Sequence, residues 1–164
     1  MMKIGWIGTG IMGGSMAGHL QVAGHELYVF NRTKDKAEPL LASGSHWCKS
    51  PVEVADNAET VFTMVALPID VEEVYMGENG IFSTQGACRI VVDMTTSRPI
   101  LAQTIARTAE ERCMNSLDAP VSGGDIGARN ATLAIMVGGK KEIFDTVLPL
   151  FQLMGQIISY MGDS

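Results

Sequence analysis

Three glycines near the start of the chain, Gly8, Gly10 and Gly13, constrain the fold more than any other feature of the sequence. They have the spacing G-x-G-x-x-G, and they lie between an apolar stretch, Lys3–Ile7, and a helical stretch from about Ile11 to Ala23. In this setting the glycines permit a tight turn, a close approach of the backbone to a pyrophosphate, and close packing of helix on strand. Free N–H groups and the helix dipole then favour the phosphates. The pattern predicts a dinucleotide-binding loop in which Gly8, Thr9, Gly10, Ile11 and Met12 contact the cofactor. The alternative is a glycine-rich turn that only packs tightly.

Apolar stretches typical of strands alternate with helical stretches along the chain. We expect strands at Lys3–Ile7, Glu26–Phe30, Ser45–Trp47, Thr60–Val65, Arg89–Asp93, Asn115–Ala119, Leu133–Val137 and Gln156–Tyr160. The expected helices after the first are Lys34–Ala42, Pro51–Ala55, Val71–Tyr75, Pro99–Glu111 and Glu142–Leu153. Such alternation indicates an α/β fold with a doubly wound, mostly parallel, Rossmann-type sheet and helices on both faces. The 164 residues suit a single domain, so we assign residues 1–164 to one dinucleotide-binding domain.

Composition excludes several other classes of protein. Hydrophobic residues make up 46% of the chain and charged residues 18%, which is typical of a globular protein and not of a disordered one. The net charge of -6 disfavours nucleic acid or an anionic membrane as a main partner. Three scattered cysteines, Cys48, Cys88 and Cys113, favour reduced thiols over a disulfide or a metal site. No uninterrupted apolar span of membrane length occurs, so we expect a cytoplasmic protein.

The end of the second expected strand bears on the choice of cofactor. An acidic residue about 20 positions beyond the glycines normally holds the ribose 2′-hydroxyl of NAD. Here the strand ends in Asn31-Arg32-Thr33, with no carboxylate. The guanidinium of Arg32 can bind a 2′-phosphate, with Asn31 and Thr33 as neutral donors. We therefore predict NADP in preference to NAD; the alternative is a solvated Arg32 beside two turn and capping residues.

Further motifs, in order along the whole chain, resemble those of the β-hydroxyacid dehydrogenases. These are IGWIGTGIMGGSMAGHL with AGHELYVFNRT, Met64-Val65-Ala66-Leu67-Pro68, Val92-Asp93-Met94-Thr95-Thr96, Asp118-Ala119-Pro120-Val121-Ser122-Gly123-Gly124 and Ile135–Gly139. That family includes 3-hydroxyisobutyrate dehydrogenase and tartronate semialdehyde reductase and, more distantly, 6-phosphogluconate dehydrogenase. The resemblance implies that Ala66, Leu67 and Pro68 line the adenosine side of the cofactor. It also implies that Thr95 and Thr96 approach the nicotinamide half.

The turn Ser122-Gly123-Gly124 resembles the family's substrate-binding signature. Two glycines can bring consecutive backbone N–H groups into a concave nest, and the serine adds a hydroxyl donor, which suits a substrate carboxylate. We therefore predict that Ser122, Gly123 and Gly124 bind a small carboxylate-bearing substrate. The alternative is an ordinary Ser-Gly-Gly turn.

The sequence also departs from the family pattern. His19 stands where asparagine is common, Ala131 where glycine is usual, and Thr95 where serine is usual. The family's catalytic lysine lies on a helix after the last strand, and the sequence ends at Ser164, before the corresponding position.

We therefore expect no catalytic residue in this chain, and we expect the family's C-terminal helical domain to be absent from it. Lys140 and Lys141 belong to an exposed turn, and the three histidines show no spacing for a catalytic or metal-binding role. The complete enzyme would transfer hydride between nicotinamide and a small β-hydroxy acid or semialdehyde, as a homo-oligomer. There are two alternatives. The chain could be a stand-alone NADP-binding or redox-sensing module without catalysis, or a truncated product with an interaction role.

Overall fold

The computed structural model describes residues 1–163, and a single sheet runs through them. Its strands are β1 (Lys3–Ile7), β2 (Glu26–Phe30), β3 (His46–Trp47), β4 (Thr60–Thr63), β5 (Ile90–Asp93), β6 (Asn115–Asp118), β7 (Val121–Ser122), β8 (Leu133–Gly139) and β9 (Gly155–Gly162). The α-helices are α1 (Ile11–Val22), α2 (Glu38–Ala42), α3 (Pro51–Asn57), α4 (Pro68–Met76), α5 (Pro99–Glu111), α6 (Gly124–Asn130) and α7 (Lys141–Phe151). Two 3₁₀ turns, η1 (Lys34–Ala37) and η2 (Ile81–Ser83), complete the structure.

Six strands form a parallel sheet in the order β3-β2-β1-β4-β5-β6. This is the order of a doubly wound dinucleotide-binding sheet, so the predicted fold class is confirmed. The chain moves outward from β1 to β3 on one side and from β4 to β6 on the other. The order therefore reverses between β1 and β4, and ligands bind such sheets in the crevice at the carboxyl ends of the strands on either side of that point.

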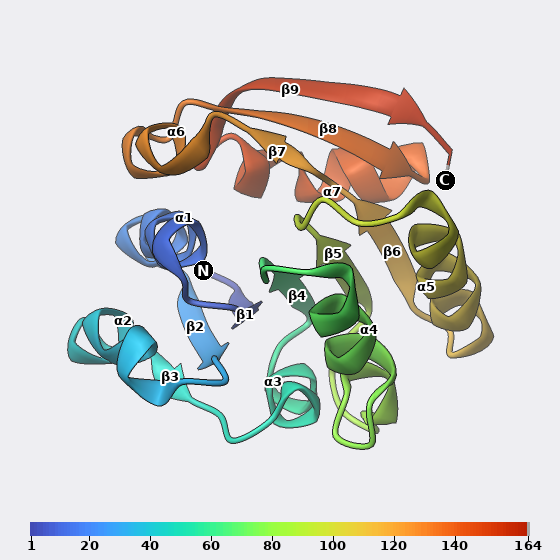
Figure 1. Ribbon diagram of the computed structural model, residues 1–164, viewed down its shortest axis with the longest axis horizontal. Coiled ribbons are helices and arrows are strands. Elements are labelled where there is room, and N and C mark those ends of the chain that lie inside the picture. The colour runs from blue at the N-terminus through green and yellow to red at the C-terminus, as the bar shows by residue number, and fades with distance from the viewer. Residues whose placement is uncertain (164) are drawn as a thin grey trace.

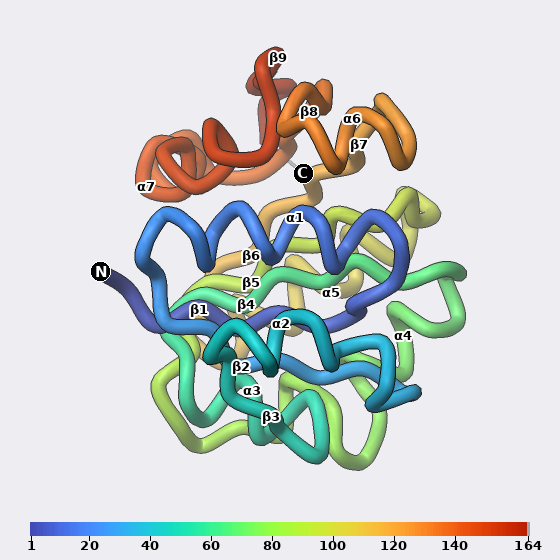
Figure 2. The backbone as a smooth tube through the Cα atoms, turned by 90° about the vertical axis from the view of Figure 1, so that its left-hand side faces the viewer, coloured from blue at the N-terminus to red at the C-terminus, as the bar shows by residue number. Residues whose placement is uncertain are grey.

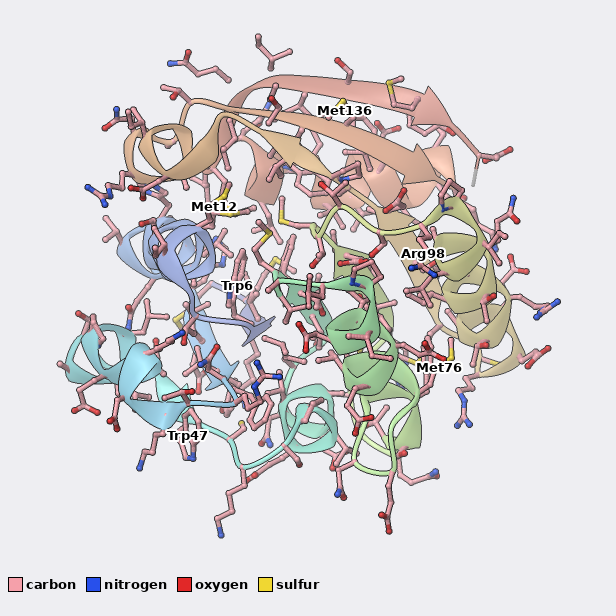
Figure 3. All side chains as sticks on the ribbon, in the orientation of Figure 1. Trp6, Met12, Trp47, Met76, Arg98 and Met136 are labelled. Carbon is pink, nitrogen blue, oxygen red and sulfur yellow. The ribbon has the colours of Figure 1, made fainter. Side chains whose placement is uncertain are left out.

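Helices cover both faces of the sheet, and each face has its own apolar core (Figure 1). On one face α1, α2 and α7 pack on the strands, whereas α3, α4 and α5 pack on the other. The indole of Trp6 lies in the middle of the molecule (Figure 3), stacked on Phe62 with a ring-centroid distance of 5.5 Å. Phe151 from α7 meets Phe62 edge-on at 6.1 Å, so the last helix packs directly on the parallel sheet.

The sequence of α1 accounts for its position on the sheet. Gly13, Met16, Ala17 and Leu20 are buried, and their spacing of three, one and three residues places them on one helical face. Small side chains at Gly13 and Ala17 let the helix axis approach the strands. The N-terminus of α1 is thereby held at the carboxyl edge of β1.

The region after β6 differs from the expectation of simple alternation. We predicted neither β7 nor α6, and β4 ends at Thr63 instead of Val65. β8 is antiparallel to β6 and β7, and β9 is parallel to β8. The segment from β7 to β9 lies over α1, which it contacts through α6 (Figure 2). The helix α6 is short and contains Gly124 and Gly127, residues of low helix propensity that concealed it in the sequence.

Candidate cofactor-binding site

The carboxyl ends of the parallel strands meet in register at one edge of the sheet. Ile7 pairs with Phe30 on one side and with Thr63 on the other, and Thr63 pairs with Asp93. The loops after these strands border a cleft of about 690 Å³. Of the predicted cofactor contacts, its lining includes Gly8, Gly10, Ile11, Met12, Asn31, Arg32, Thr33 and Ala66. The structure thus brings the glycine loop, the end of β2 and the loop after β4 together around one cleft.

The other predicted contacts lie outside the lining of this cleft. These are Thr9, Leu67, Pro68, Thr95, Thr96 and the turn Ser122, Gly123 and Gly124. Thr9 is buried, since only 3% of its surface is exposed, whereas Thr96 and the three residues of the turn are exposed. The roles expected of these residues stay predictions.

Gly8 and Gly13 are positions where any side chain would collide with the backbone. A Cβ on Gly8 would lie 2.0 Å from the carbonyl oxygen of Met64, and Gly8 has a φ of +95° that L-residues rarely adopt. A Cβ on Gly13 would lie 2.0 Å from the carbonyl oxygen of Gly8. The indole N–H of Trp6 donates to that same oxygen at 2.9 Å. These glycines hold α1 tightly against the ends of β1 and β4.

Gly10 differs from its two neighbours in the motif because it faces open space. A Cβ placed there would meet nothing within 4 Å, and its φ of −67° suits any residue. Gly10 is also the N-cap of α1, and no side chain caps the helix. The N–H groups of the first helical turn have no partner within the helix, so they are available to an anion in the cleft. The absence of a side chain at Gly10 leaves room for that anion.

Asn31 connects the end of β2 to the glycine loop. Its Oδ1 accepts a hydrogen bond from the backbone N–H of Thr9 at 2.9 Å, and its Nδ2 donates to the carbonyl of Thr33 at 2.8 Å. We predicted Asn31 as a donor to a 2′-phosphate; in the structure one of the two N–H groups of its amide is bound to the backbone, and the predicted role stays a prediction. Its observed contacts are those of a residue that fixes the relative positions of two loops bordering the cleft.

Arg32 lies at the mouth of the cleft, where 87% of its side chain is exposed. Its Nη1 donates to Oδ1 of Asp70, in the first turn of α4, at 3.1 Å. Lys36 and Lys49 also line the cleft and are exposed. Three cationic side chains therefore border a cleft in a protein of net charge -6. The lining also contains two carboxylates, Asp70 and Glu73, so the cations exceed the anions by one, and this small excess of positive charge favours a phosphorylated ligand.

Asp93, Thr95 and Val65 form a hydrogen-bonded link between the loops after β4 and β5. Oδ1 of Asp93 accepts from the backbone N–H of Thr95 at 2.9 Å, and Oδ2 accepts from the hydroxyl of Ser97 at 2.9 Å. Oγ1 of Thr95 in turn accepts from the N–H of Val65 at 3.0 Å. A hydroxyl at position 95 thus joins two loops, and threonine provides it as serine would.

The carboxyl group of Asp93 is almost wholly buried, with 4% of the residue exposed. Burial raises the pKa of Asp93 to about 6, although the hydrogen bonds from Thr95 and Ser97 favour the charged form. Asp118, its register partner on β6, also has a pKa raised by burial. Two carboxyl groups with raised pKa values therefore lie side by side at the carboxyl edge of the sheet.

The turn that we predicted to bind substrate is followed directly by α6. Ser122 ends β7, Gly123 has a φ of +134°, and Gly124 begins the helix with a φ of +59°. These positive values favour glycine, and positive φ values are also found where consecutive backbone N–H groups form a nest. Ala131, where the family usually has glycine, ends α6 in the left-handed conformation with a φ of +54°. The usual glycine at this position is therefore explained by backbone geometry.

His19, Lys140 and Lys141, to which the sequence assigned no catalytic role, have structural partners. Nε2 of His19 lies 2.8 Å from the carbonyl oxygen of Ala128, so this histidine links α1 to α6. Lys140 pairs with Glu110 at 2.8 Å, and Lys141 pairs with Asp145. Within residues 1–163, no group of three His, Cys, Asp or Glu side chains could hold a metal ion. In the same residues no helix has the length and apolar character needed to cross a membrane.

Comparison with known proteins identifies the family. The model of the NAD binding domain of 6-phosphogluconate dehydrogenase matches residues 3–162. The chain belongs to this family. It is 52% identical over 159 residues to the uncharacterized oxidoreductase YkwC of Bacillus subtilis, covering 97% of this chain and 55% of that protein. It is 43% identical to 2-hydroxy-3-oxopropionate reductase of Escherichia coli, covering 98% of this chain and 55% of that enzyme.

A solved structure agrees with these relatives. The 3-hydroxyisobutyrate dehydrogenase of Mycobacterium tuberculosis, with L-serine, superimposes with a TM-score of 0.91 at 32% identity. The match covers 100% of this chain and 55% of that one. The chain thus spans about half the length of the curated relatives it matches. It is an NAD(P)-binding domain of the kind found in hydroxyacid dehydrogenases, as the resemblance implied.

Sequence reasoning missed several residues that border the cleft or hold its loops. Lys36, Lys49 and Asp70 line the cleft, and Asp93 joins two of its loops. A signal for Asp70 was present, because an acidic residue shortly after Pro68 is typical of the first turn of a helix. Lys36 follows Arg32 by four positions and could have been associated with it. Lys49 lies beyond β3, and nothing in its neighbourhood indicated that it returns to the cleft.

The first prediction separates the structural glycines from the one that leaves room for a ligand. Gly10→Ala should lose less than about 1 kcal/mol of stability but bind NADPH at least about tenfold more weakly, because the methyl group enters the cleft. Gly13→Ala should be destabilised by about 1–3 kcal/mol through overpacking. Urea unfolding and calorimetric titration measure the two effects. Gly18→Ala, whose Cβ would make ordinary contact, is the control. Unchanged NADPH affinity in Gly10→Ala would contradict the assignment.

The second prediction concerns the pH dependence of stability. Because folding raises the pKa of Asp93 from 3.8 to about 6, the folded chain binds this proton more tightly than the unfolded chain. The stability contributed by the protonated group is present below about pH 4 and is lost as the pH rises through 6.

Asp93→Asn removes this titration while its amide can still accept from Thr95 and donate to Ser97. The free energy of unfolding of the native chain, relative to this variant, should therefore fall by about 2–3 kcal/mol between pH 4 and 7. Urea unfolding at several pH values measures the difference, in which the titrating groups that do not interact with Asp93 cancel. A difference that does not vary with pH would show that Asp93 titrates normally.

Proposed function

We propose that this domain binds NADP in preference to NAD. The observation that carries the proposal is Arg32, an exposed guanidinium at the mouth of the cleft, on a strand end without a carboxylate. A guanidinium can bind two oxygens of a 2′-phosphate at once, and such charge-assisted bonds are stronger than neutral ones. Lys36 and Lys49 add positive charge to the same cleft. An acidic residue at the end of β2 would instead repel the phosphate.

The arrangement of the cleft supports a definite orientation of the cofactor. The pyrophosphate lies at the N-terminus of α1, above Gly10, and the adenosine half extends towards Arg32 and Thr33. The nicotinamide half then extends towards the loop after β5. In this proposal Thr95 and Thr96 approach the nicotinamide, and Ala66, Leu67 and Pro68 border the adenosine side.

We further propose that the complete protein is an oxidoreductase that transfers hydride between nicotinamide and a small β-hydroxy acid or semialdehyde. The names of its relatives support this reaction class. The turn at Ser122, Gly123 and Gly124 would bind the substrate carboxylate, and the proton donor would lie in the part of the relatives that this chain does not span. We also propose that the complete protein is a homo-oligomer and that it is located in the cytoplasm. Semialdehyde reduction with NADPH by a polypeptide of the relatives' full length tests it, and lack of turnover with every semialdehyde tried would refute it.

The third prediction tests the preference for NADP. Arg32→Gln should weaken NADPH binding by about ten- to a hundredfold, because it removes a charge-assisted bond worth about 1.5–3 kcal/mol. NADH binding should change by less than about threefold, since NADH has no 2′-phosphate. Calorimetric titration of both cofactors measures the two affinities. Arg112→Gln, an exposed arginine just after α5, is the control. Equal affinity of the native chain for NADPH and NADH would overturn the proposal.

A further inference from the structure

Asp70 connects two walls of the cleft through its ion pair with Arg32. It lies in the first turn of α4, after β4, whereas Arg32 follows β2, so the ion pair between them joins two walls of the cleft. Both side chains belong to the lining of the cleft. The pair therefore involves the guanidinium that we assign to the 2′-phosphate.

The carboxylate of Asp70 is held more firmly than its partner. Its Oδ2 accepts a hydrogen bond from the backbone N–H of Leu67 at 3.1 Å, at the start of α4. Its side chain is 21% exposed, compared with 87% for Arg32. The carboxylate is thus anchored to the helix terminus, and the guanidinium is the accessible member of the pair.

These contacts affect the two cofactors differently. A 2′-phosphate on Arg32 would lie within a few ångströms of the Asp70 carboxylate, because both anions bind the same guanidinium. The phosphate must then displace the carboxylate or share the guanidinium with it, against the repulsion of like charges. NAD carries a hydroxyl at this position and meets neither cost.

We infer that Asp70 is a specificity-determining residue, whose carboxylate competes with the 2′-phosphate for Arg32 and so reduces the preference for NADP over NAD. This inference rests on the proposed role of Arg32. Asp70 moderates the discrimination that Arg32 provides, and the domain retains useful affinity for both cofactors.

Calorimetric titrations of NADPH and NADH with Asp70→Asn, Arg32→Gln and the double variant test the inference. Asp70→Asn removes the charge, and its side-chain oxygen can still accept from Leu67, so the helix start is preserved. NADPH should bind about three- to tenfold more tightly to this variant, and NADH should change by less than about twofold. In the Arg32→Gln background the gain for NADPH should fall below about twofold, because the competition no longer exists.

A matched control and a second variant separate the effect of the Asp70 carboxylate from a change in net charge. Glu72→Gln removes a negative charge from an exposed position of α4 outside the lining of the cleft, and it should change neither affinity. Asp70→Ser removes the same charge as Asp70→Asn, and it offers a hydroxyl instead of an amide oxygen as the acceptor. It should give the same gain in NADPH affinity. Urea unfolding confirms that each variant is folded.

The outcomes separate this inference from the proposed function. If Arg32→Gln leaves NADPH binding unchanged, the proposed preference for NADP fails, and the inference fails with it. If Arg32→Gln weakens NADPH but Asp70→Asn does not tighten it, the inference about Asp70 alone is overturned. An equal gain in Glu72→Gln would also overturn it, because the effect would then be a general one of net charge.

Discussion

The close packing of the N-terminus of α1 against the ends of β1 and β4 is the contact on which the rest of the site depends. Gly8 and Gly13 allow it, because a Cβ at either position would collide with a backbone carbonyl oxygen at 2.0 Å. The indole N–H of Trp6 donates a hydrogen bond to the carbonyl oxygen of Gly8, and the indole is itself stacked on Phe62. The packing of the core, the glycine turn and the start of α1 therefore depend on one another. Together they place the first turn of α1, with its free N–H groups, at the cleft, where the helix dipole also favours an anion.

Side-chain hydrogen bonds then fix the loops around that helix terminus. Asn31 joins the loop after β2 to Thr9, and Thr95 joins the loop after β5 to Val65. The carboxyl group of Asp93 holds Thr95 in place, and its burial raises its pKa to about 6. A buried ionisable group is a cost to stability, but here it orders two loops at the edge where the cofactor is expected. These hydrogen bonds hold the loops that border the cleft in fixed positions.

Much of the fold could be predicted because local patterns agree with the tertiary structure. The helix Pro99–Glu111 has the predicted bounds, since Pro99 begins it, and β1 and β2 also have theirs. Prediction failed where no local pattern exists. The glycines of α6 have low helix propensity, and the antiparallel pairing of β8 with β6 depends on contacts between distant segments. The glycine loop could likewise be predicted as part of the site from its motif.

The rest of the site could not be predicted from local sequence patterns, because it depends on contacts between distant segments. Asn31 and Arg32 could be recognised as the end of a strand, but their partners Thr9 and Asp70 are set by the tertiary fold. Asp93 belongs to a recognised motif, yet its role follows from burial and from bonds to Thr95 and Ser97.

The central claim is that the N-terminus of α1 binds the pyrophosphate, and amide chemical shifts test it most directly. Adding NADPH to the isotope-labelled chain should shift the backbone amide resonances of Ile11, Met12 and Gly13 the most, because in this account their N–H groups would bind the phosphates. Gly18 and the later residues of α1 should shift much less. Saturable binding with unshifted resonances at residues 11–13, and large shifts elsewhere, would contradict the account.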